Sequence, residues 1–256
     1  MTLSSSEWHN RFTQQAQWTY DLRHHLYARL NLKHSDRILD VGCGTGVITS
    51  ELNSLSEGHI FGLDILKAHL TLAQKYASQA AFTLGDAHHI PYETGNFDIT
   101  VCHFLLLWVS NPIKVVSEMA RVTQPGGSVL VLAEPDYGGR IDYPDELSIL
   151  GEWQQESLRR QGANPQIGRR LAEIFQQCGL RDHEIGVLGG QWSGSTILDD
   201  WESEWAILEY DMEQMNKTSK SASRLKDIDL SARERGERVL FVPTFYAMGR
   251  VPNLQD

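Results

Sequence analysis

The fold is decided by the stretch Arg37-Ile-Leu-Asp-Val-Gly-Cys-Gly-Thr-Gly46. Its first five residues form a short, largely apolar run of the kind that makes a buried strand, and its three glycines are typical of a tight turn. Residues 47–55 follow with the spacing of a helix. A strand, a glycine turn and a helix in this order begin a βαβ unit.

The same alternation continues along the chain. Further strands are predicted at residues 60–64, 81–84, 97–102 and 128–133, and further helices at 67–78 and 112–123. Five strands that alternate with helices indicate a parallel sheet covered by helices on both faces. We therefore expect an α/β, doubly wound fold.

Segments on both sides extend this core. Residues 4–30 carry apolar side chains at spacings of three and four, which predicts one or two amphipathic helices. The pattern further along predicts a loop over 135–144, helices over 145–160 and 167–178, a sixth strand over 184–192 and a last strand over 241–248. Pro243 favours an edge or terminal position for that last strand.

The length fits one enlarged domain. The chain has 256 residues, no internal repeat and no low-complexity linker, so we predict a single domain over residues 1–256. Its expected parts are a helical cap (1–33), a core (34–135), additions that include the sixth strand (136–240) and the last strand (241–250).

Composition limits where in the cell the protein is expected and which partners it is expected to bind. The 23 Lys and Arg residues against 33 Asp and Glu give a net charge of −10, which disfavours a nucleic-acid partner. Three cysteines are too few for a disulfide framework, the first ten residues lack the features of a signal peptide, and no apolar run reaches the length of a membrane span. We expect a cytoplasmic protein. No His-x-x-x-His or Cys-x-x-Cys pattern occurs, so we expect no bound metal.

The ends of the predicted strands carry residues suited to a nucleoside. The turn Gly42-x-Gly44-x-Gly46 lets backbone N–H groups approach a ligand at a helix N-terminus. Asp64, at the end of the next strand, can accept hydrogen bonds from both hydroxyls of a ribose. Asp86, after the third strand, suits the exocyclic amine of a purine. The last glycine of the dinucleotide fingerprint is replaced by Val47, which disfavours nicotinamide-dependent redox chemistry.

These motifs, with Gly62-Leu-Asp-Ile65, Gly85-Asp-Ala87 and the segment 119–135 (MARVTQPGGSVLVLAEP), resemble the class I S-adenosylmethionine-dependent methyltransferases. Within them the chain is most similar to the small-molecule group that includes the quinone-biosynthesis enzymes. The resemblance implies a Rossmann-like seven-stranded sheet whose last strand is antiparallel and lies beside the fifth. It also implies S-adenosylmethionine as cofactor and S-adenosylhomocysteine as product.

The resemblance assigns roles residue by residue. The cofactor-binding residues it implies are Gly42, Cys43 and Gly44 in the turn, Asp64 for the ribose, Ile65 and Ala87 beside adenine, Asp86 for the adenine amine and His103 for the methionyl part. Cys43 is equally a candidate for a small packing residue. We expect Asp40 to order the turn rather than to touch ligand.

The acceptor is expected to meet the loops after the fourth and fifth strands and whatever covers them. His103 and Tyr137 are predicted to act in catalysis, although a base is needed only where the nucleophile carries a proton. Six of the seven tryptophans lie outside the core. Where such side chains line the acceptor site, they favour an apolar or aromatic small molecule. The predicted substrate residues are Trp18, Phe104, Tyr137 and Trp192.

Other chemistries lack their residues. The Asn/Asp-Pro-Pro-Tyr/Phe segment of amino-methylating nucleic-acid enzymes is replaced by His103-Phe-Leu-Leu, and no cysteine follows a proline as a pyrimidine C5-methyltransferase would need. A second function stays open at this stage, namely a protein that binds S-adenosylmethionine without a methyl acceptor, as a sensor or partner subunit. The acceptor atom and the oligomeric state do not follow from the sequence.

Overall fold

The computed structural model describes residues 5–30, 32–35, 37–189, 201–214 and 219–253. The chain divides into two compact units. The first unit comprises Met1–Glu134, Arg169–Leu188 and Phe245–Asp256, and the second comprises Pro135–Gly168 and Gly189–Thr244. The predicted core belongs to the first unit, and most of the predicted additions belong to the second.

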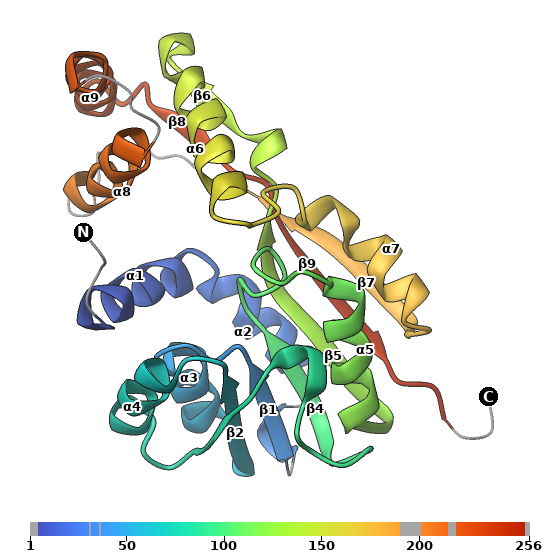
Figure 1. Ribbon diagram of the computed structural model, residues 1–256. Coiled ribbons are helices and arrows are strands. Elements are labelled where there is room, and N and C mark those ends of the chain that lie inside the picture. The colour runs from blue at the N-terminus through green and yellow to red at the C-terminus, as the bar shows by residue number, and fades with distance from the viewer. Residues whose placement is uncertain (1–4, 31, 36, 190–200, 215–218, 254–256) are drawn as a thin grey trace. The chain divides into compact units, whose positions relative to one another are not determined.

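The first unit is built on a seven-stranded sheet in the order β3-β2-β1-β4-β5-β9-β7 (Figure 1). Its strands are β1 (Arg37–Val41), β2 (His59–Asp64), β3 (Ala81–Leu84), β4 (Phe97–Cys102), β5 (Thr123–Pro135), β7 (Arg181–Leu188) and β9 (Thr244–Arg250). Parallel pairs join β1 to β2, β1 to β4, β2 to β3 and β4 to β5. The predicted doubly wound, mostly parallel sheet is confirmed.

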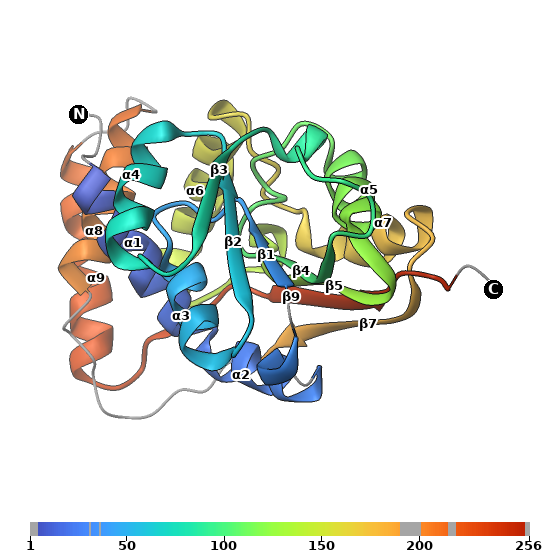
Figure 2. The ribbon, with the colours of Figure 1, turned by 90° about the horizontal axis from the view of Figure 1, so that it is seen from below.

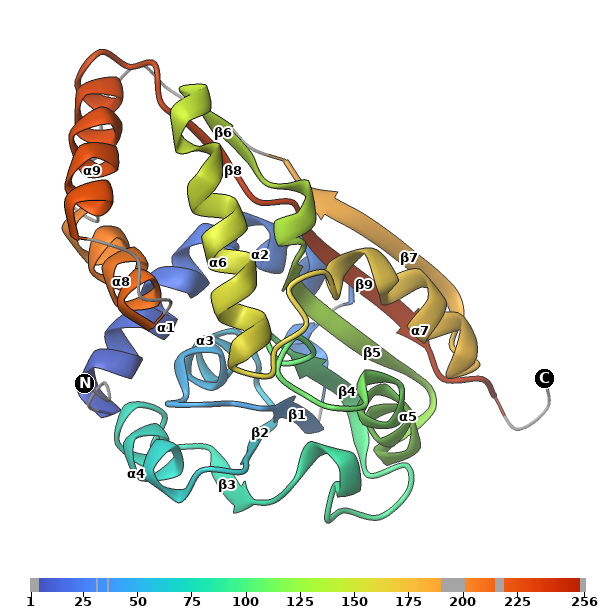
Figure 3. The ribbon, with the colours of Figure 1, turned by 45° about the horizontal axis from the view of Figure 1, so that its top comes forward.

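The last strand runs against its neighbours. The N–H of Gly126, near the start of β5, donates to the carbonyl of Val251, just past the end of β9, at 2.9 Å, and the N–H of Val251 donates to Gly127 at 3.0 Å. Because the start of one strand meets the end of the other, the two strands are antiparallel. Figure 3 shows the arrows of β7 and β9 pointing in opposite directions. The predicted antiparallel last strand is confirmed.

Of the two positions expected for Pro243, an edge strand or a strand terminus, the edge is wrong. The strand β9 lies between β5 and β7 inside the sheet. Pro243 precedes its first residue, Thr244, so the missing N–H removes no hydrogen bond from the ladder. Its carbonyl instead accepts from the N–H of Asp136 at 2.7 Å.

Helices cover both faces of the sheet. They are α1 (Ser5–Trp18), α2 (Tyr20–Arg29), α3 (Val47–Leu55), α4 (Lys67–Tyr76), α5 (Pro112–Val122) and α7 (Leu171–Gln177), with short 3₁₀ turns at η1 (Leu32–His34), η2 (Ala87–His89) and η5 (Gly168–Arg170). Figure 2 shows α3 and α4 on one side of the sheet and α5 and α7 on the other. On the first of these sides an apolar cluster joins helices to strands through fully buried side chains that include Leu26, Ile38, Leu52, Val101 and Leu130.

The helix α5 shows how local sequence sets these elements. Asn111 caps it, because its side-chain oxygen accepts from the N–H of Lys114 at 3.0 Å, and Pro112 occupies a first-turn position where no N–H is needed. Val115 and Met119, one turn apart, are completely buried. The helix ends at Val122, and β5 begins at Thr123, five residues before the predicted start at Ser128.

The second unit consists of helices and one small sheet. It contains α6 (Ser148–Arg160), α8 (Trp201–Gln214), α9 (Ser219–Glu234), the turns η3 (Tyr137–Gly139) and η4 (Asp145–Leu147), and the strands β6 (Ile141–Tyr143) and β8 (Val239–Phe241). The strands pair antiparallel, with Ile141 opposite Phe241. The expected loop over 135–144 thus contains a strand, which local sequence could not reveal because its partner lies far along the chain.

Candidate functional site

The loops after the strands of the first unit meet at one edge of the sheet. Val41, the last residue of β1, lies opposite Leu63 of β2 and Cys102 of β4, and Asp64 lies opposite Leu84 of β3. In parallel α/β sheets this carboxyl edge is where ligands bind. All the residues predicted to bind a cofactor belong to this unit and to these loops.

The glycine turn is folded onto the end of β2. The N–H groups of Gly42 and Cys43 both donate to the carbonyl of Leu63, at 2.7 and 2.9 Å. Gly42 and Gly44 have φ angles of 72° and 53°, which glycine adopts without strain. A Cβ on Gly42 would lie 2.7 Å from Leu105, so the turn also leaves no room for a side chain there.

Asp64 connects the glycine turn to the loop that follows β2. Its Oδ2 accepts from the N–H of Gly44 at 2.9 Å and its Oδ1 from the N–H of Leu66 at 2.8 Å, while Nδ1 of His69 lies 3.5 Å from Oδ1. Asp64 is 9% exposed, and the next residue, Ile65, is 64% exposed. A held carboxylate therefore stands beside an apolar surface.

Asp40 lies deeper in the same region. Its carboxylate is buried and accepts from the hydroxyl of Thr49 on α3 at 2.6 Å. Burial raises the pKa of Asp40 to about 7. This carboxylate therefore joins β1 to the helix that follows the turn. Cys43 is also buried, and its thiol lies 2.9 Å from the place of a Cβ on Gly62 of β2.

Asp86 and Ala87 lie at the third strand end. Oδ1 of Asp86 accepts from the backbone N–H of His88 at 2.9 Å and from Nδ1 of the same residue at 2.7 Å, and these bonds lower the pKa of Asp86. Nε2 of His88 accepts in turn from the N–H of Asn111 at 3.3 Å. The Asp86 side chain is 46% exposed, so the carboxylate is held in place but reaches solvent.

The loop after β4 is held by one buried carboxylate. Glu134, fully buried at the end of β5, accepts from the N–H groups of Leu105, Leu106 and Leu107 at 2.9, 2.7 and 3.1 Å. Burial raises its pKa to about 8, although the three N–H donors act against this. Phe104 precedes these residues with a φ of 50°, a strained value for a non-glycine residue.

His103 lies on the same loop. Its ring meets that of Phe104 edge to face, with centroids 4.5 Å apart, and its Nε2 lies 2.9 Å from the hydroxyl of Thr19. Burial, together with the positive charge of Arg23, lowers the pKa of His103 well below the ordinary value. The ring is therefore neutral at pH 7.

The N-terminal helix contributes residues that sequence reasoning missed. Nδ1 of His9 lies 2.8 Å from the hydroxyl of Thr45, and its ring stacks on Tyr76 at 3.7 Å. Phe12 packs against Gly44, with a ring carbon 3.0 Å from the place a Cβ would take. Helical periodicity signals that α1 packs on something, but it does not say that the partner is the glycine turn. Trp18, at the end of α1, is 53% exposed.

The other two predicted residues are Tyr137 and Trp192. Tyr137 belongs to the second unit, where its N–H donates to the carbonyl of Pro165 at 2.8 Å. Trp192 lies outside the described residues. The cofactor-binding residues and Trp18 and Phe104 thus share the first unit, and Tyr137 does not.

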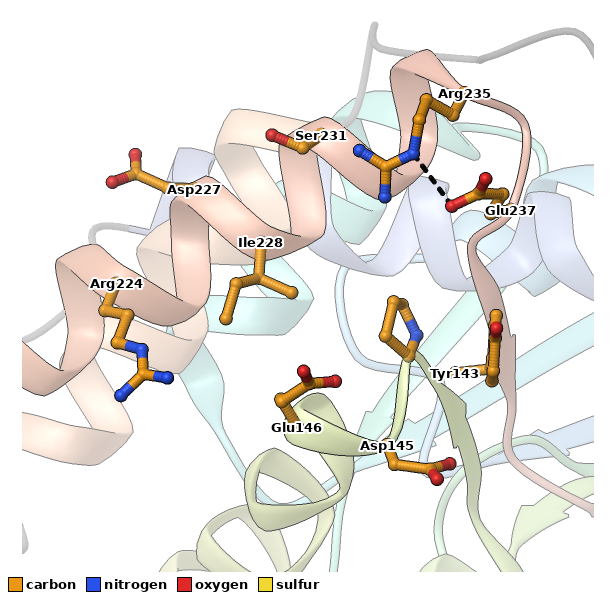
Figure 4. Close-up of a pocket in the computed structure, with 10 residues that line it drawn as sticks. Tyr143, Asp145, Glu146, Arg224, Asp227, Ile228, Ser231, Arg235 and Glu237 are labelled. Carbon is orange, nitrogen blue, oxygen red and sulfur yellow. Dashed lines mark hydrogen bonds and ion pairs between the residues drawn. The ribbon is translucent and has the colours of Figure 1, made fainter.

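The second unit has an open cavity of its own, of about 770 Å³, between α9 and the segment around η4 (Figure 4). It is lined by Tyr143, Pro144, Asp145, Glu146, Arg224, Asp227, Ile228, Ser231, Arg235 and Glu237. An ion pair of 2.8 Å joins Arg235 to Glu237 at its rim. None of the predicted site residues lines it.

The part of the chain that the structure describes contains neither a membrane-spanning helix nor a metal-binding cluster. Within it, no helix has the length and apolar character needed to cross a membrane. Within the same residues, no three His, Cys, Asp or Glu side chains gather closely enough to hold a metal ion.

Comparison with known proteins identifies the family of the chain. Residues 39–131 match the family described as Methyltransferase domain. Over 153 residues the chain is 33% identical to an uncharacterised methyltransferase of Schizosaccharomyces pombe, and the match covers 55% of each chain, so it spans about half of that relative. Over 175 residues it is 31% identical to a demethylmenaquinone methyltransferase of Bacillus licheniformis, with 60% of this chain and 74% of the relative covered.

A solved structure shares the fold. Phosphoethanolamine N-methyltransferase 2 of Haemonchus contortus, in complex with phosphomonomethylethanolamine and S-adenosylhomocysteine, has a TM-score of 0.59 and 17% identity, with 94% of this chain and 57% of that chain covered. The sheet order and the strand-end residues define a class I methyltransferase fold. The chain belongs to the S-adenosylmethionine-dependent methyltransferase family, and S-adenosylmethionine is the cofactor of that family.

Proposed function

We propose that this chain transfers a methyl group from S-adenosylmethionine to a small, apolar or aromatic metabolite. When bound, the cofactor would supply an electrophilic methyl group on a sulfonium, whose carbon the nucleophile would attack in line with the departing sulfur of S-adenosylhomocysteine. The chain's own residues bind and align the two reactants. Alignment supplies much of the rate in such a reaction, so no covalent bond to the protein is required.

The observation that carries this proposal is the carboxylate of Asp64. Each of its oxygens already holds one backbone N–H, and a carboxylate oxygen accepts more than one hydrogen bond. Capacity therefore remains for both hydroxyls of a ribose, with the exposed side chain of Ile65 beside it as an apolar flank. These residues fit a nucleoside.

The remaining cofactor residues are proposed on the same pattern. Asp86 would accept from the adenine amine, and Ala87 would lie against the ring. Gly42 and Gly44 would face the methionine part with backbone alone, and the side chain of Cys43 between them is buried.

An apolar ring is the acceptor that the neighbouring residues suit best. Trp18 exposes about half of its surface, and Phe104 is held on the strained loop after β4. The name of the Bacillus licheniformis relative says that it methylates demethylmenaquinone, a quinone-type acceptor. We propose Trp18, Phe104, Tyr137 and Trp192 as substrate residues and His103 and Tyr137 as the groups nearest the reaction.

We propose a small-molecule partner rather than a nucleic acid, because the net charge of −10 repels phosphate. We propose the cytoplasm as its location, because the three cysteines, Cys43, Cys102 and Cys178, are all free thiols.

Calorimetric titration with S-adenosylhomocysteine tests the cofactor assignment. We expect binding to the wild type, no binding of NAD, and at least a tenfold weaker affinity in Asp64→Ala, which corresponds to about 1.4 kcal/mol. Glu93→Ala, which removes an exposed carboxylate from the loop before β4, is the matched control and should bind as the wild type does. Normal binding by Asp64→Ala would show that the ribose assignment is wrong.

A panel of acceptors then tests the reaction. Purified protein with S-adenosylmethionine should methylate quinone-type or other aromatic acceptors. Binding of S-adenosylhomocysteine without turnover over a broad panel would favour the second function, a protein that binds the cofactor and has no methyl acceptor.

A further inference from the structure

A chain of polar contacts runs from Glu51 to His103 in the first unit. Arg23, on α2, is 1% exposed, and its Nε and Nη2 donate to the two carboxylate oxygens of Glu51 on α3, Nε at 2.9 Å. Its Nη1 donates to the carbonyl of Ala16 and to the hydroxyl oxygen of Thr19. That hydroxyl lies 2.9 Å from Nε2 of His103. A buried cation, balanced by Glu51, is thus linked to the histidine through one hydroxyl.

Thr19 lies at the break between α1 and α2, and its side chain does not cap the helix that follows. Threonine is a favoured N-cap, because its oxygen can accept from the first N–H groups of the helix that follows. Thr19 occupies the N-cap position of α2 but makes no such bond. Its oxygen is used by Arg23, and its hydroxyl faces His103 instead. A conflict between local preference and observed contact is typical of a residue with a functional role.

The direction of the proton on Thr19 follows from its partners. The hydroxyl has one hydrogen, and its oxygen already accepts from Arg23, a group that can only donate. The hydrogen can go to Nε2 of His103 at 2.9 Å or to the carbonyl of Ala16 at 3.4 Å. The carbonyl of Ala16 already accepts from Arg23 and from the N–H of Thr19. The shorter contact, to Nε2, is the better use of the hydroxyl hydrogen, and it requires the ring hydrogen to lie on Nδ1.

We propose that Arg23 and Thr19 are positioning residues that hold His103 as the tautomer with its hydrogen on Nδ1, so that the ring serves methyl transfer as a hydrogen-bond donor and not as a base. This inference rests on the proposed function for its mechanistic meaning, since it concerns the role of His103 at the candidate site. With Nε2 occupied by Thr19 and Nδ1 protonated, the ring has no lone pair left to remove a proton.

The charges around the ring support a neutral histidine. Arg23, on the helix that also carries these contacts, disfavours a second positive charge on His103, and burial of the ring acts in the same direction. Glu51 balances Arg23 rather than the histidine, because both of its oxygens are bound by the guanidinium. The ring therefore offers an N–H without an imidazolium charge.

A His103 that cannot act as a base limits the kinds of nucleophile that the acceptor can carry. A nucleophile that must lose a proton before or during methyl transfer would need another base, because His103 cannot accept it. A nucleophile that reacts as an anion or as a neutral lone pair, with the Nδ1 hydrogen orienting it, fits this arrangement.

Nitrogen NMR of protein with ¹⁵N-labelled histidine tests the tautomer directly. His103→Gln identifies the ring signals by their disappearance, and long-range nitrogen–proton couplings then show which nitrogen is protonated. We expect Nδ1 to carry the hydrogen in the wild type and in Thr19→Ser, which keeps the hydroxyl. In Thr19→Val, which has the same shape without the hydroxyl, we expect the ring to lose this single tautomer.

The outcomes are distinct. A hydrogen on Nε2 in the wild type, or an unchanged ring signal in folded Thr19→Val, would overturn the inference, and the wild-type measurement needs His103→Gln only to assign the ring signals. The NMR readout needs no cofactor or acceptor. A failure to bind S-adenosylhomocysteine would thus count against the proposed function alone, and the wrong tautomer against this inference alone.

Discussion

The two units differ in the interactions that stabilise the interior of each. The first unit buries apolar side chains of a sheet and its covering helices, and its inner strand β1 has Ile38, Leu39 and Val41 completely buried. The second unit has a smaller apolar cluster around Trp205 and Leu150, and beside it a network of buried charges.

The network in the second unit is centred on Asp229 of α9. Its Oδ2 accepts from the indole N–H groups of Trp201 and Trp205, at 2.6 and 2.9 Å, and from Arg233 at 3.0 Å. Its Oδ1 accepts from Arg238 at 2.5 Å, and Arg238 also donates to Asp142 on β6. Asp142 in turn holds Arg140.

The difference concerns how stability is distributed. An apolar core divides its stabilisation among many side chains, each contributing a part. A buried ion network depends on each member, because removing one leaves its partners charged and without a counter-ion. We therefore expect the second unit to be the more sensitive to one well-chosen substitution.

The largest effect is expected from Asp229→Ala. It would remove the carboxylate that two indoles and two guanidiniums share, although Arg238 keeps its bond to Asp142. Breaking a buried pair of this kind costs about 3–5 kcal/mol. Urea unfolding gives the loss in free energy, and hydrogen exchange locates it, with peptides of α8 and α9 losing protection while β1 and β4 keep theirs. Asp227→Ala, at an exposed position of the same helix, is the control and should change stability by no more than about 0.5 kcal/mol. A loss below 1 kcal/mol in Asp229→Ala would mean that the apolar cluster alone holds this unit.

A somewhat smaller effect is expected from Leu130→Ala in the first unit. Leu130 is fully buried on β5, and truncating such a side chain costs about 2–4 kcal/mol. In this variant hydrogen exchange should rise across the strands of the sheet. Leu84→Ala, on the exposed end of β3, is the same change at a site 56% exposed and should have little effect. If both variants behaved alike, burial on β5 would not be the source of the stability.

The smallest effect is expected from Glu118→Gln on α5. Hydrogen bonds from Arg121 lower the pKa of Glu118 to about 2, and Lys114 and the N–H of Ile90 add to this. Because the folded-state pKa is lowered, the stabilisation is present above the unfolded value of 4.5 and is lost as the pH falls towards 2. We expect a loss of about 1 kcal/mol at pH 7, since Arg121 is partly exposed and screened by solvent.

The pH dependence separates this effect from a change in packing. The stability difference between the wild type and Glu118→Gln should shrink between pH 4.5 and 2 in urea unfolding. Glu57→Gln, in an exposed pair with Lys33, serves as the control and should show almost no difference at any pH. A constant difference for Glu118→Gln would contradict the electrostatic explanation.

Much of the fold was accessible from the sequence. The strands of the core, the glycine turn and the carboxylates Asp64 and Asp86 follow from local patterns, because a parallel sheet brings the ends of its strands to one edge. The strand β6 was not accessible, since its residues look like a polar loop until β8 pairs with them. The network around Asp229 was equally hidden, because the patterns at 197–238 show only mixed charges.

Some residues of the candidate site are recognisable from the sequence, and others only from their contacts in the structure. Asp64 is recognised by its place at a strand end, whereas Thr19 carries no local signal and is recognised only by its contact with His103, 84 positions further along. Phe12 is visible in the sequence as one apolar position of a helix, and the structure alone shows that it packs on Gly44.

The sequence by itself determined the order of strands and helices, the glycine turn and the carboxylates that point to a nucleoside. These features depend on the periodicity of apolar residues and on the φ angles that glycine permits, both of which are properties of neighbouring residues. Only the tertiary structure decided which partner each buried polar group has. Such partners are set by packing between segments far apart in the chain, because a buried polar group must be satisfied by whatever group the fold brings to it.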